Sequence, residues 1–290
     1  MNLTISCKAL QKNYGAKKVL KGIDLEIPAG TVVALLGTNG AGKTTLIRTI
    51  LGLIPKTKGE IRVLGEEPYK LGALLRQRIG YVSEEQGLYG WMSVHEIVDF
   101  CKSLYPVWDQ KLVDTYLLRF KINPKTKIQA LSKGQQVKLA LLLALAPKPE
   151  LLILDEPMSG LDPLAQHEFL QVIMNEKKAG RTIFFSTHNL GDAMAVADQV
   201  AIVYDGKIQA YGSIAAICAT ITKITTDLQF SPDANTRHVL LSENATAKTF
   251  LIAAEAFGEI AAASETPLDQ PTPPSVTLAE AFLFYCAGGE

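Results

Sequence analysis

A glycine-rich stretch, GTNGAGKTT, has the residue types and spacing of a phosphate-binding loop. It follows a short apolar run, VVALLG, and precedes a helical pattern, as such a loop requires. Glycines let backbone N–H groups close around phosphate oxygens, and the next helix N-terminus adds partial positive charge. The predicted loop residues are Gly37, Thr38, Asn39, Gly40, Ala41, Gly42, Lys43, Thr44 and Thr45.

Three side chains of this loop have predictable roles toward a nucleoside triphosphate. We expect Lys43 to bridge the β- and γ-phosphates and Thr44 to ligate Mg²⁺. Thr45 would add a hydroxyl near the α-phosphate. The loop therefore predicts a nucleotide site that works with Mg²⁺.

Two adjacent carboxylates end a second apolar run, LLILDE at 151–156. We expect Asp155 to hold Mg²⁺ through water. Successive side chains of a strand point to opposite faces, so Glu156 is expected away from the metal, where it can polarise an attacking water. Together with the loop, this pair predicts hydrolysis of the nucleotide.

The segment LSKGQQV at 131–137 has a plain interpretation as the start of a buried helix. Ser132 followed three residues later by Gln135 is a capping box, in which each side chain satisfies a free backbone N–H of the other residue. The apolar run KLALLLALA continues that helix. Nothing in the segment by itself requires a further role.

Composition excludes several classes of protein. The chain has 290 residues, 29 Lys and Arg against 29 Asp and Glu, and 48% apolar residues. The zero net charge argues against a general nucleic-acid binder. Four scattered cysteines predict free thiols instead of a zinc site or a disulfide framework. We see neither a secretory signal nor an apolar run long enough to span a membrane.

Short β patterns alternate with helical ones, which predicts an α/β fold with a parallel sheet and helices on both faces. Residues 1–30 read as short strands, and 200–212 as a hairpin with an Asp-Gly turn. A helical block spans about 87–147. Asp162-Pro163 begins a helix that stops at Gly180.

The chain changes character after about residue 213, where Ala and Thr increase. We expect a small α+β appendage at 214–290. Its predicted elements are strands in ITKITTDLQF and TRHVLLS, a helix in ATAKTFLIAAEAFG, a flexible Pro-rich segment at 265–275 and a helix in LAEAFLFYC.

The motifs together resemble the nucleotide-binding subunit of ATP-binding-cassette (ABC) transporters. They run in that family's order over residues 1–213: Tyr14, GTNGAGKTT, IGYVSEE, LSKGQQ, LLILDEP, SGLD and STH. YPVWD, LSKGQ, DEPMSGLDP and PSVTLAEAFLF resemble the bacterial type-2 exporter class more closely. The resemblance implies an ATPase domain at 1–213, with a RecA-like parallel sheet core, an antiparallel β subdomain and a helical subdomain at about 87–147. The accessory domain would be 214–290.

The resemblance also implies roles for individual residues. Tyr14 matches the aromatic residue that stacks on adenine, and His188 matches the residue that contacts the γ-phosphate. Asp162 matches a dimer-interface residue. Ser132, Gly134 and Gln135 match the segment that one subunit presents to the γ-phosphate held by the other, a role compatible with a capping box.

Partners and location follow from the same resemblance. It implies ATP and Mg²⁺ as cofactors, a second ATPase subunit (identical or related) and a polytopic membrane subunit. The chain would then lie at the cytoplasmic face of the cell membrane. Tyr89 and Trp91 are candidates for contact with that membrane subunit, or else core residues.

Three positions depart from the family pattern. Glu84 replaces a Gln that touches Mg²⁺ and follows Ser83 instead of a Pro, Lys133 replaces a Gly, and Thr38 replaces a Pro. A carboxylate is a good Mg²⁺ ligand, so Glu84 is a predicted metal residue. Glu84 and Lys133 keep open the alternative of a regulatory subunit that does not hydrolyse ATP. A soluble, non-transport ABC-type ATPase is a separate alternative.

Overall fold

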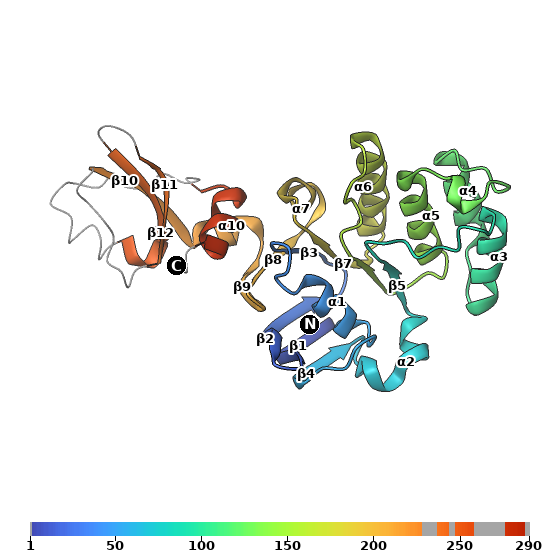
Figure 1. Cartoon of the computed structure of the whole chain (residues 1–290), viewed down its shortest axis with the longest axis horizontal. Helices are drawn as coiled ribbons and strands as arrows, with labels where there is room; N and C mark the ends of the chain where they lie inside the picture. Colours follow the sequence, from blue (N-terminus) through green and yellow to red (C-terminus); the bar gives the residue numbers. More distant parts are fainter. Residues whose placement is uncertain (1, 228–236, 244–246, 258–275, 288–290) are drawn as a thin grey trace.

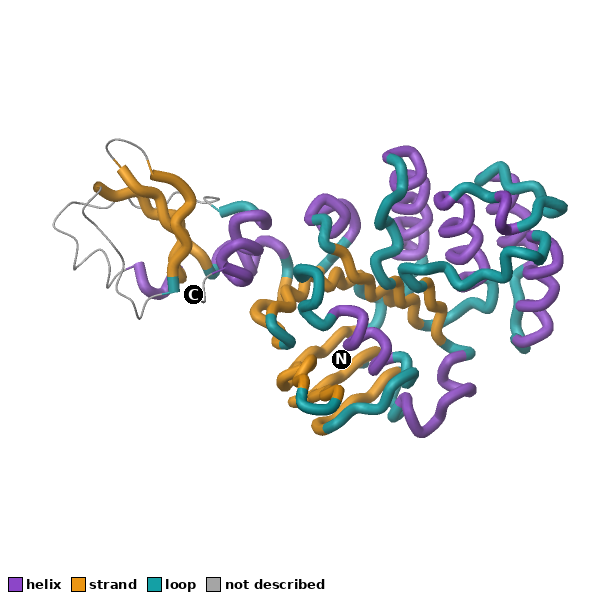
Figure 2. Tube along the Cα trace, in the orientation of Figure 1, coloured by secondary structure: helices purple, strands orange, loops and turns teal. Residues whose placement is uncertain are grey.

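The computed structural model describes residues 2–227, 237–243, 247–257 and 276–287. Three sheets, with the helices packed around them, form this part of the chain (Figures 1 and 2). The Pro-rich segment at 265–275, predicted to be flexible, lies outside the described residues.

A six-stranded sheet in the order β5-β6-β7-β3-β8-β9 forms the centre of the fold. The first five strands of that order are parallel, and β9 pairs with β8 as an antiparallel edge strand, in the predicted hairpin. This confirms the predicted parallel sheet. The strands are β3 (Val32–Leu36), β5 (Ile79–Val82), β6 (Leu151–Leu154), β7 (Thr182–Thr187), β8 (Gln199–Tyr204) and β9 (Lys207–Gly212).

Alternate residues of the central strands face two different cores. In β3, Val33 and Leu35 pack on the side that faces the N-terminal antiparallel sheet and α1 (Lys43–Ile50). Val32, Ala34 and Leu36 pack on the other side. Because both faces are covered, the strand is apolar throughout instead of alternating with polar residues.

Helices cover the second face of the central sheet (Figure 1). They are α5 (Lys133–Leu145), α6 (Pro163–Lys178) and α7 (Leu190–Val196). Asp162 caps α6 by accepting a hydrogen bond from the Ala165 N–H at 2.9 Å, and Pro163 occupies the first turn. Gly180, with φ 77°, follows the end of this helix, as predicted.

The N-terminal sheet is antiparallel, in the order β2-β1-β4. Its strands are β1 (Leu3–Tyr14), β2 (Lys17–Pro28) and β4 (Lys58–Val63). β1 and β2 each have 12 residues, so the prediction of short strands over 1–30 is wrong. Register shifts around Ala9, which has φ 45°, let β1 continue where the sequence pattern is irregular.

The predicted helical block contains α3 (Val94–Leu104), α4 (Gln110–Arg119), a short 3₁₀ turn (Ile128–Ala130) and α5. Ser93 and Glu96 form a complete capping box at the start of α3, and Asp109 caps α4. An additional helix, α2 (Pro68–Arg76), precedes β5 and was not predicted.

A third sheet, in the order β10-β12-β11, lies in the C-terminal part of the chain. Its strands are β10 (Ile221–Asp227), β11 (His238–Glu243) and β12 (Ala247–Ala253). The helix predicted in ATAKTFLIAAEAFG is wrong, because β12 is the central strand of this sheet. Its alanines and lysine favour a helix, but the run from Thr249 to Ile252 favours a strand and is paired on both sides.

Two helices connect this sheet with the rest of the molecule. They are α8 (Ile214–Ala219) and the predicted terminal helix α10 (Leu278–Ala287). Leu278, Ala281 and Phe284 of α10 are buried in the same core as one face of the central sheet. The C-terminal elements are therefore packed onto the main core, and a division into two domains at residue 213 stays a prediction.

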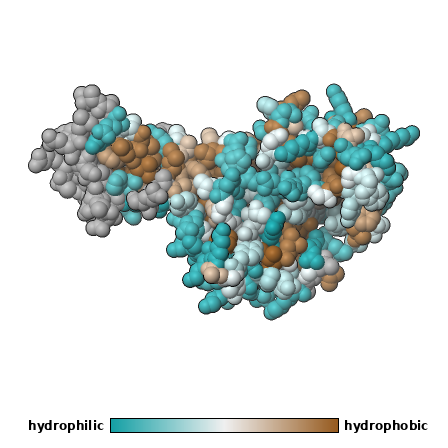
Figure 3. Space-filling view, in the orientation of Figure 1, coloured by the Kyte–Doolittle hydropathy of each residue, from teal (hydrophilic) through white to brown (hydrophobic). Residues whose placement is uncertain are grey.

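The face drawn in Figure 3 is mainly hydrophilic, with hydrophobic residues gathered over the strands of the C-terminal sheet. Leu240 of β11 is one exposed hydrophobic residue in that sheet. Among the described helices, none has both the length and the apolar character that crossing a membrane requires.

The central strand β7 provides a test of how the core stabilises the fold. Its residue Phe184 is fully buried in the core between the central sheet, the N-terminal sheet and α1. Phe184→Ala should lower the free energy of unfolding by about 3–5 kcal/mol, because the lost side chain leaves a cavity. Urea denaturation followed by circular dichroism measures this change.

Leu118→Ala is the control, because Leu118 on α4 is 82% exposed. We expect a change of less than about 0.5 kcal/mol for this surface position. Equal unfolding free energies for the two variants would contradict the assignment of Phe184 to a tightly packed core.

Candidate active site

A cleft of 680 Å³ opens at the carboxyl ends of the central strands. The segments that follow β3, β6, β7 and β8 all contribute to its walls. This is the edge of a parallel sheet where ligands bind in open α/β folds. The predicted site residues in its lining are Tyr14, Asn39, Gly40, Gly42, Lys43, Thr44, Thr45, Glu84, Glu156 and His188.

The glycine-rich loop joins β3 to α1 and takes a conformation that requires glycine. Gly40 and Gly42 have φ values of 82° and 107°. A side chain at Gly37 would lie 2.6 Å from the Val203 carbonyl oxygen. Gly42 caps α1 without a side-chain hydrogen bond, so the first backbone N–H groups of this helix have no side-chain cap. Such a helix start can accept a phosphate.

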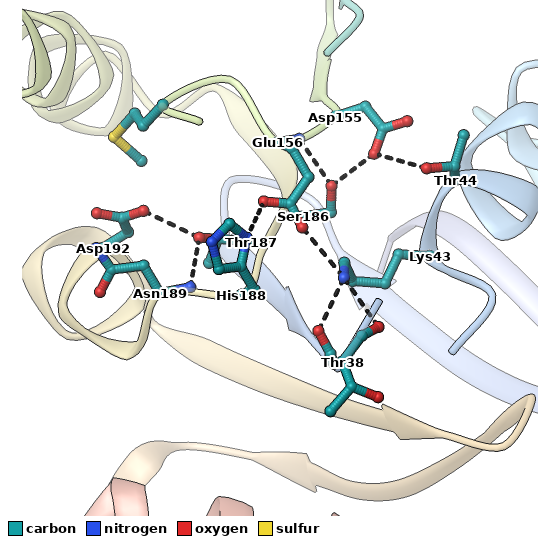
Figure 4. A network of polar contacts seen from close by, with 12 residues as sticks. Thr38, Lys43, Thr44, Asp155, Glu156, Ser186, Thr187, His188, Asn189 and Asp192 are labelled. Carbon is teal, nitrogen blue, oxygen red and sulfur yellow. Dashed lines mark hydrogen bonds and ion pairs between the residues drawn. The ribbon is translucent and has the colours of Figure 1, made fainter. Parts of the chain in front are cut away.

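Lys43 is 6% exposed and is held on three sides. Its ammonium group donates hydrogen bonds to the carbonyl oxygens of Gly37 at 2.8 Å and Thr38 at 3.2 Å. It also forms an ion pair with Glu156 Oε1 at 3.1 Å. The cation is therefore fixed within the loop that is predicted to bind phosphates (Figure 4).

The two carboxylates after β6 are both buried and have separate partners. Asp155 Oδ1 accepts hydrogen bonds from Ser186 Oγ at 2.7 Å and from Thr44 Oγ1 at 3.4 Å. Glu156 lies between Lys43 and His188, whose Nδ1 is 2.8 Å from Glu156 Oε2. One carboxylate thus faces the predicted Mg²⁺ ligand, and the other faces two basic side chains (Figure 4).

The Asp155 and Glu156 side chains are separated for a different reason from the predicted one. Alternation along a strand was expected to place Glu156 on the opposite face, but β6 ends at Leu154. Glu156 instead has φ 46°, in the left-handed region that a residue other than glycine rarely adopts. The sharp turn after the strand, and not the strand itself, separates the two side chains.

His188 follows β7, and the residues on either side of it are hydrogen-bonded to each other and to a buried carboxyl group. The Thr187 hydroxyl donates to Asp192 Oδ2 at 2.9 Å and accepts from the Asn189 N–H at 3.0 Å. Burial raises the pKa of the Asp192 carboxyl, and the Thr187 hydrogen bond partly opposes that shift. The His188 ring itself is more than half exposed in the cleft, so it can contact a ligand there.

Tyr14 and Glu84 lie on the rim of the cleft. The Tyr14 side chain is 48% exposed, and the Lys12 ammonium is 4.9 Å from its ring centroid. Glu84 is exposed. Their positions fit contact with a ligand in the cleft, while adenine stacking and Mg²⁺ binding stay predictions.

The LSKGQQ segment lies outside this cleft. Ser132, Gly134, Gln135 and Asp162 line a separate cavity of 350 Å³, which has no lining residue in common with the cleft. The predicted capping box is confirmed: Ser132 Oγ accepts from the Gln135 N–H at 3.2 Å, and Gln135 Oε1 accepts from the Ser132 N–H at 3.1 Å. The predicted residues that line these two spaces therefore lie in two separate groups.

Several residues of the cleft wall were not predicted: Lys17, Lys18, Ser159 and Asp205. Asp205 could have been predicted from the sequence, because the predicted Asp-Gly turn follows a strand whose carboxyl end faces the cleft. Ser186 was also missed, although it contacts both Asp155 and Glu156.

A family model described as ABC transporter matches residues 20–159. The uncharacterized ABC transporter ATP-binding protein YhaQ of Bacillus subtilis is 37% identical over 211 residues, covering 71% of this chain and 70% of YhaQ. The bacitracin transport ATP-binding protein BcrA of Bacillus licheniformis is 34% identical over 211 residues, covering 72% of this chain and 69% of BcrA.

A solved structure of an ATP-binding subunit of an ABC transporter superimposes with a TM-score of 0.68. It is 30% identical in sequence, and the match covers 74% of this chain and 92% of that chain. The fold, the position of the cleft and the sequence similarity all indicate the same family. The chain belongs to the ABC transporter family, as one of its ATP-binding, ATP-hydrolysing subunits.

Proposed function

We propose that this chain is the motor subunit of an ABC exporter, in which two ATPase subunits enclose ATP head to tail. The observation that carries this proposal is the separation of the predicted site residues into the cleft and the LSKGQQ cavity. If one ATP molecule is to contact both groups, the second group has to come from another subunit.

The LSKGQQ cavity is suited to an anion presented from outside. Ser132 Oγ accepts a hydrogen bond from Gln135, so its own O–H is left to donate to a phosphate oxygen. Ser132 also begins α5, whose N-terminus carries partial positive charge. A γ-phosphate held by a second subunit would therefore join the two surfaces, and hydrolysis would remove that bridge.

Residues of the cleft fit Mg²⁺ only together with a nucleotide. Among the described residues, no group of three His, Cys, Asp or Glu side chains is arranged to hold a metal. Thr44 and Asp155 supply two adjacent oxygen atoms, and Mg²⁺ in such sites takes its other ligands from phosphates and water. Thr44 and Asp155 would hold the ion, with Glu84 as a third candidate, and bound Mg²⁺ would neutralise phosphate charge.

Glu156 is the proposed general base. It is buried, lies beside the predicted γ-phosphate ligands Lys43 and His188, and contacts neither Thr44 nor Ser186 through its carboxylate. This position suits a group that polarises water and leaves Asp155 to the metal. Tyr14 would stack on adenine at the rim.

An apolar groove of 330 Å³ beside β5 is the proposed docking site for the membrane subunit. Tyr89 and Trp91 follow its lining residue Leu88 in the chain and are 50% and 67% exposed, so they are not core residues. The ring centroids of Tyr89 and Trp91 are 6.0 Å apart, and those of Tyr89 and Phe100 are 6.1 Å apart. An exposed aromatic cluster of this kind supplies the anchors that protein interfaces use.

Export is proposed from two sequence similarities. The chain resembles the type-2 exporter class in YPVWD and in DEPMSGLDP. A relative that matches most of the chain is named for bacitracin transport. In this assembly the chain would sit at the cytoplasmic face of the membrane. A soluble, non-transport ABC-type ATPase is the alternative.

Glu156→Gln tests both the general base and the dimer. ATP hydrolysis should fall by about 10²–10⁴-fold, because the amide cannot accept the proton. The variant should still bind ATP and accumulate as a dimer with ATP and Mg²⁺. Steady-state phosphate release and light scattering during size-exclusion chromatography measure the two results.

Glu150→Gln is the matched control, because Glu150 lies beside the other end of β6 and pairs with Arg78 outside the cleft. It should hydrolyse ATP at the parental rate. Parental hydrolysis in Glu156→Gln would refute its role as base. Loss of hydrolysis without an ATP-dependent dimer would leave that role standing and overturn the head-to-tail assembly.

The double variant Tyr89→Ala/Trp91→Ala tests the docking site. Loss of two exposed aromatic anchors should weaken binding to the membrane subunit at least about thirtyfold, from a loss of about 2 kcal/mol or more. Affinity purification from native membranes in mild detergent, with partners identified by mass, measures this binding.

Leu118→Ala, an exposed apolar residue on α4 outside the groove, should co-purify like the parent. Undiminished co-purification of the aromatic double variant would rule out this surface. If the parental chain brings down only soluble proteins, the transport proposal fails in favour of the non-transport ATPase.

A further inference from the structure

Ser186 is a buried hydroxyl that directly follows three apolar core residues of its strand. Its strand β7 contains the large apolar residues Ile183, Phe184 and Phe185, and Ser186 itself has no exposed surface. Burying a hydroxyl costs free energy unless its hydrogen bonds are made inside the protein. The contacts that Ser186 makes are therefore a guide to why a polar residue occupies this position.

Both hydrogen-bonding functions of Ser186 are used on the carboxylate pair. Its O–H donates to Asp155 Oδ1 at 2.7 Å, and its oxygen accepts the backbone N–H of Glu156 at 2.9 Å (Figure 4). One small side chain thus contacts the proposed metal ligand and the backbone of the proposed general base.

The contact with the Glu156 N–H falls where the backbone is strained. Glu156 has φ 46°, in the left-handed region that is unfavourable for a residue with a side chain. On the other side of this turn, the Asp155 N–H donates to the Val82 carbonyl of β5 at 2.8 Å. The turn is therefore held from β5 through Asp155 and from β7 through Ser186.

We propose that Ser186 is a positioning residue for ATP hydrolysis, which orients the Asp155 carboxylate and holds the strained turn that directs Glu156 toward Lys43 and His188. This inference rests on the proposed roles of Asp155 and Glu156 and adds the residue that keeps the two apart. Ser186 touches neither the metal nor the nucleotide in this scheme; it acts through its two neighbours.

Ser186→Ala removes both hydrogen bonds and keeps the volume of the side chain nearly unchanged. Turnover should fall by about 10–100-fold, the range for groups that orient metal ligands. The Mg²⁺ concentration for half-maximal activity should rise, because the Asp155 carboxylate is no longer oriented. Binding of a fluorescent ATP analogue in EDTA should stay at the parental affinity, since the loop around Lys43 is untouched.

Thr182→Val is the matched control, because it removes another buried hydroxyl from the same strand. Thr182 is 3% exposed, accepts from the Gly30 N–H at 2.9 Å and lies at the end of β7 away from the cleft. The Thr182→Val variant should lose about as much stability as Ser186→Ala, measured by thermal unfolding. It should keep parental turnover and parental Mg²⁺ dependence.

A general loss of stability predicts equal activity losses in Ser186→Ala and Thr182→Val, and that outcome would overturn the proposal. Parental turnover and Mg²⁺ dependence in Ser186→Ala would do the same. If Ser186→Ala does not fold, Ser186→Cys keeps the space filled with a weaker donor. It should show the same rise in Mg²⁺ requirement, and a parental value would count against the proposal.

These results are separable from those on Glu156. Inactive Glu156→Gln together with fully active Ser186→Ala would remove the role of Ser186 and leave the proposed base intact. Active Glu156→Gln would remove the proposed base itself, whatever Ser186→Ala does.

Discussion

Two adjacent carboxylates at the buried edge of a parallel sheet set the constraint on which this site depends. Asp155 and Glu156 are 2% and 8% exposed, so their charges repel in a region with little water to screen them. This repulsion is offset because each carboxylate has its own partners. Asp155 is bound by two hydroxyls, and Glu156 by a buried lysine and a histidine. A buried charge is tolerated only when hydrogen bonds or an opposite charge compensate it.

The rest of the fold keeps these partners in place. They come from different segments: Lys43 from the start of α1, the carboxylates from the end of β6, and Ser186 and His188 from the end of β7. Parallel pairing of β3, β6 and β7 sets these ends side by side. Because alternate side chains of these strands pack in two different cores, a one-residue change of register would move each side chain into the other core, and the positions of the ends are fixed accordingly.

Local sequence was enough to predict the loop, the carboxylate pair, the caps at Ser132 and Asp162 and the parallel sheet, because each depends on residue types a few positions apart. Three features depend on distant contacts and were missed or mistaken. β12 became a strand because it pairs on both sides. Glu156 adopts a positive φ that its residue type disfavours. The role of Ser186 can be inferred only from its contacts with Asp155 and Glu156, some thirty residues earlier in the chain.

The same distinction between local and distant contacts applies to the LSKGQQ segment. Within one chain, its capping box is complete and explains why Ser132 and Gln135 are present. It does not explain why the helix start is left exposed at a cavity that shares no wall with the cleft. A capping box buried against the core would stabilise α5 equally well. In the proposed dimer, that exposed helix start becomes the phosphate-facing part of the other subunit's site, and the two halves of the site meet only while ATP is bound.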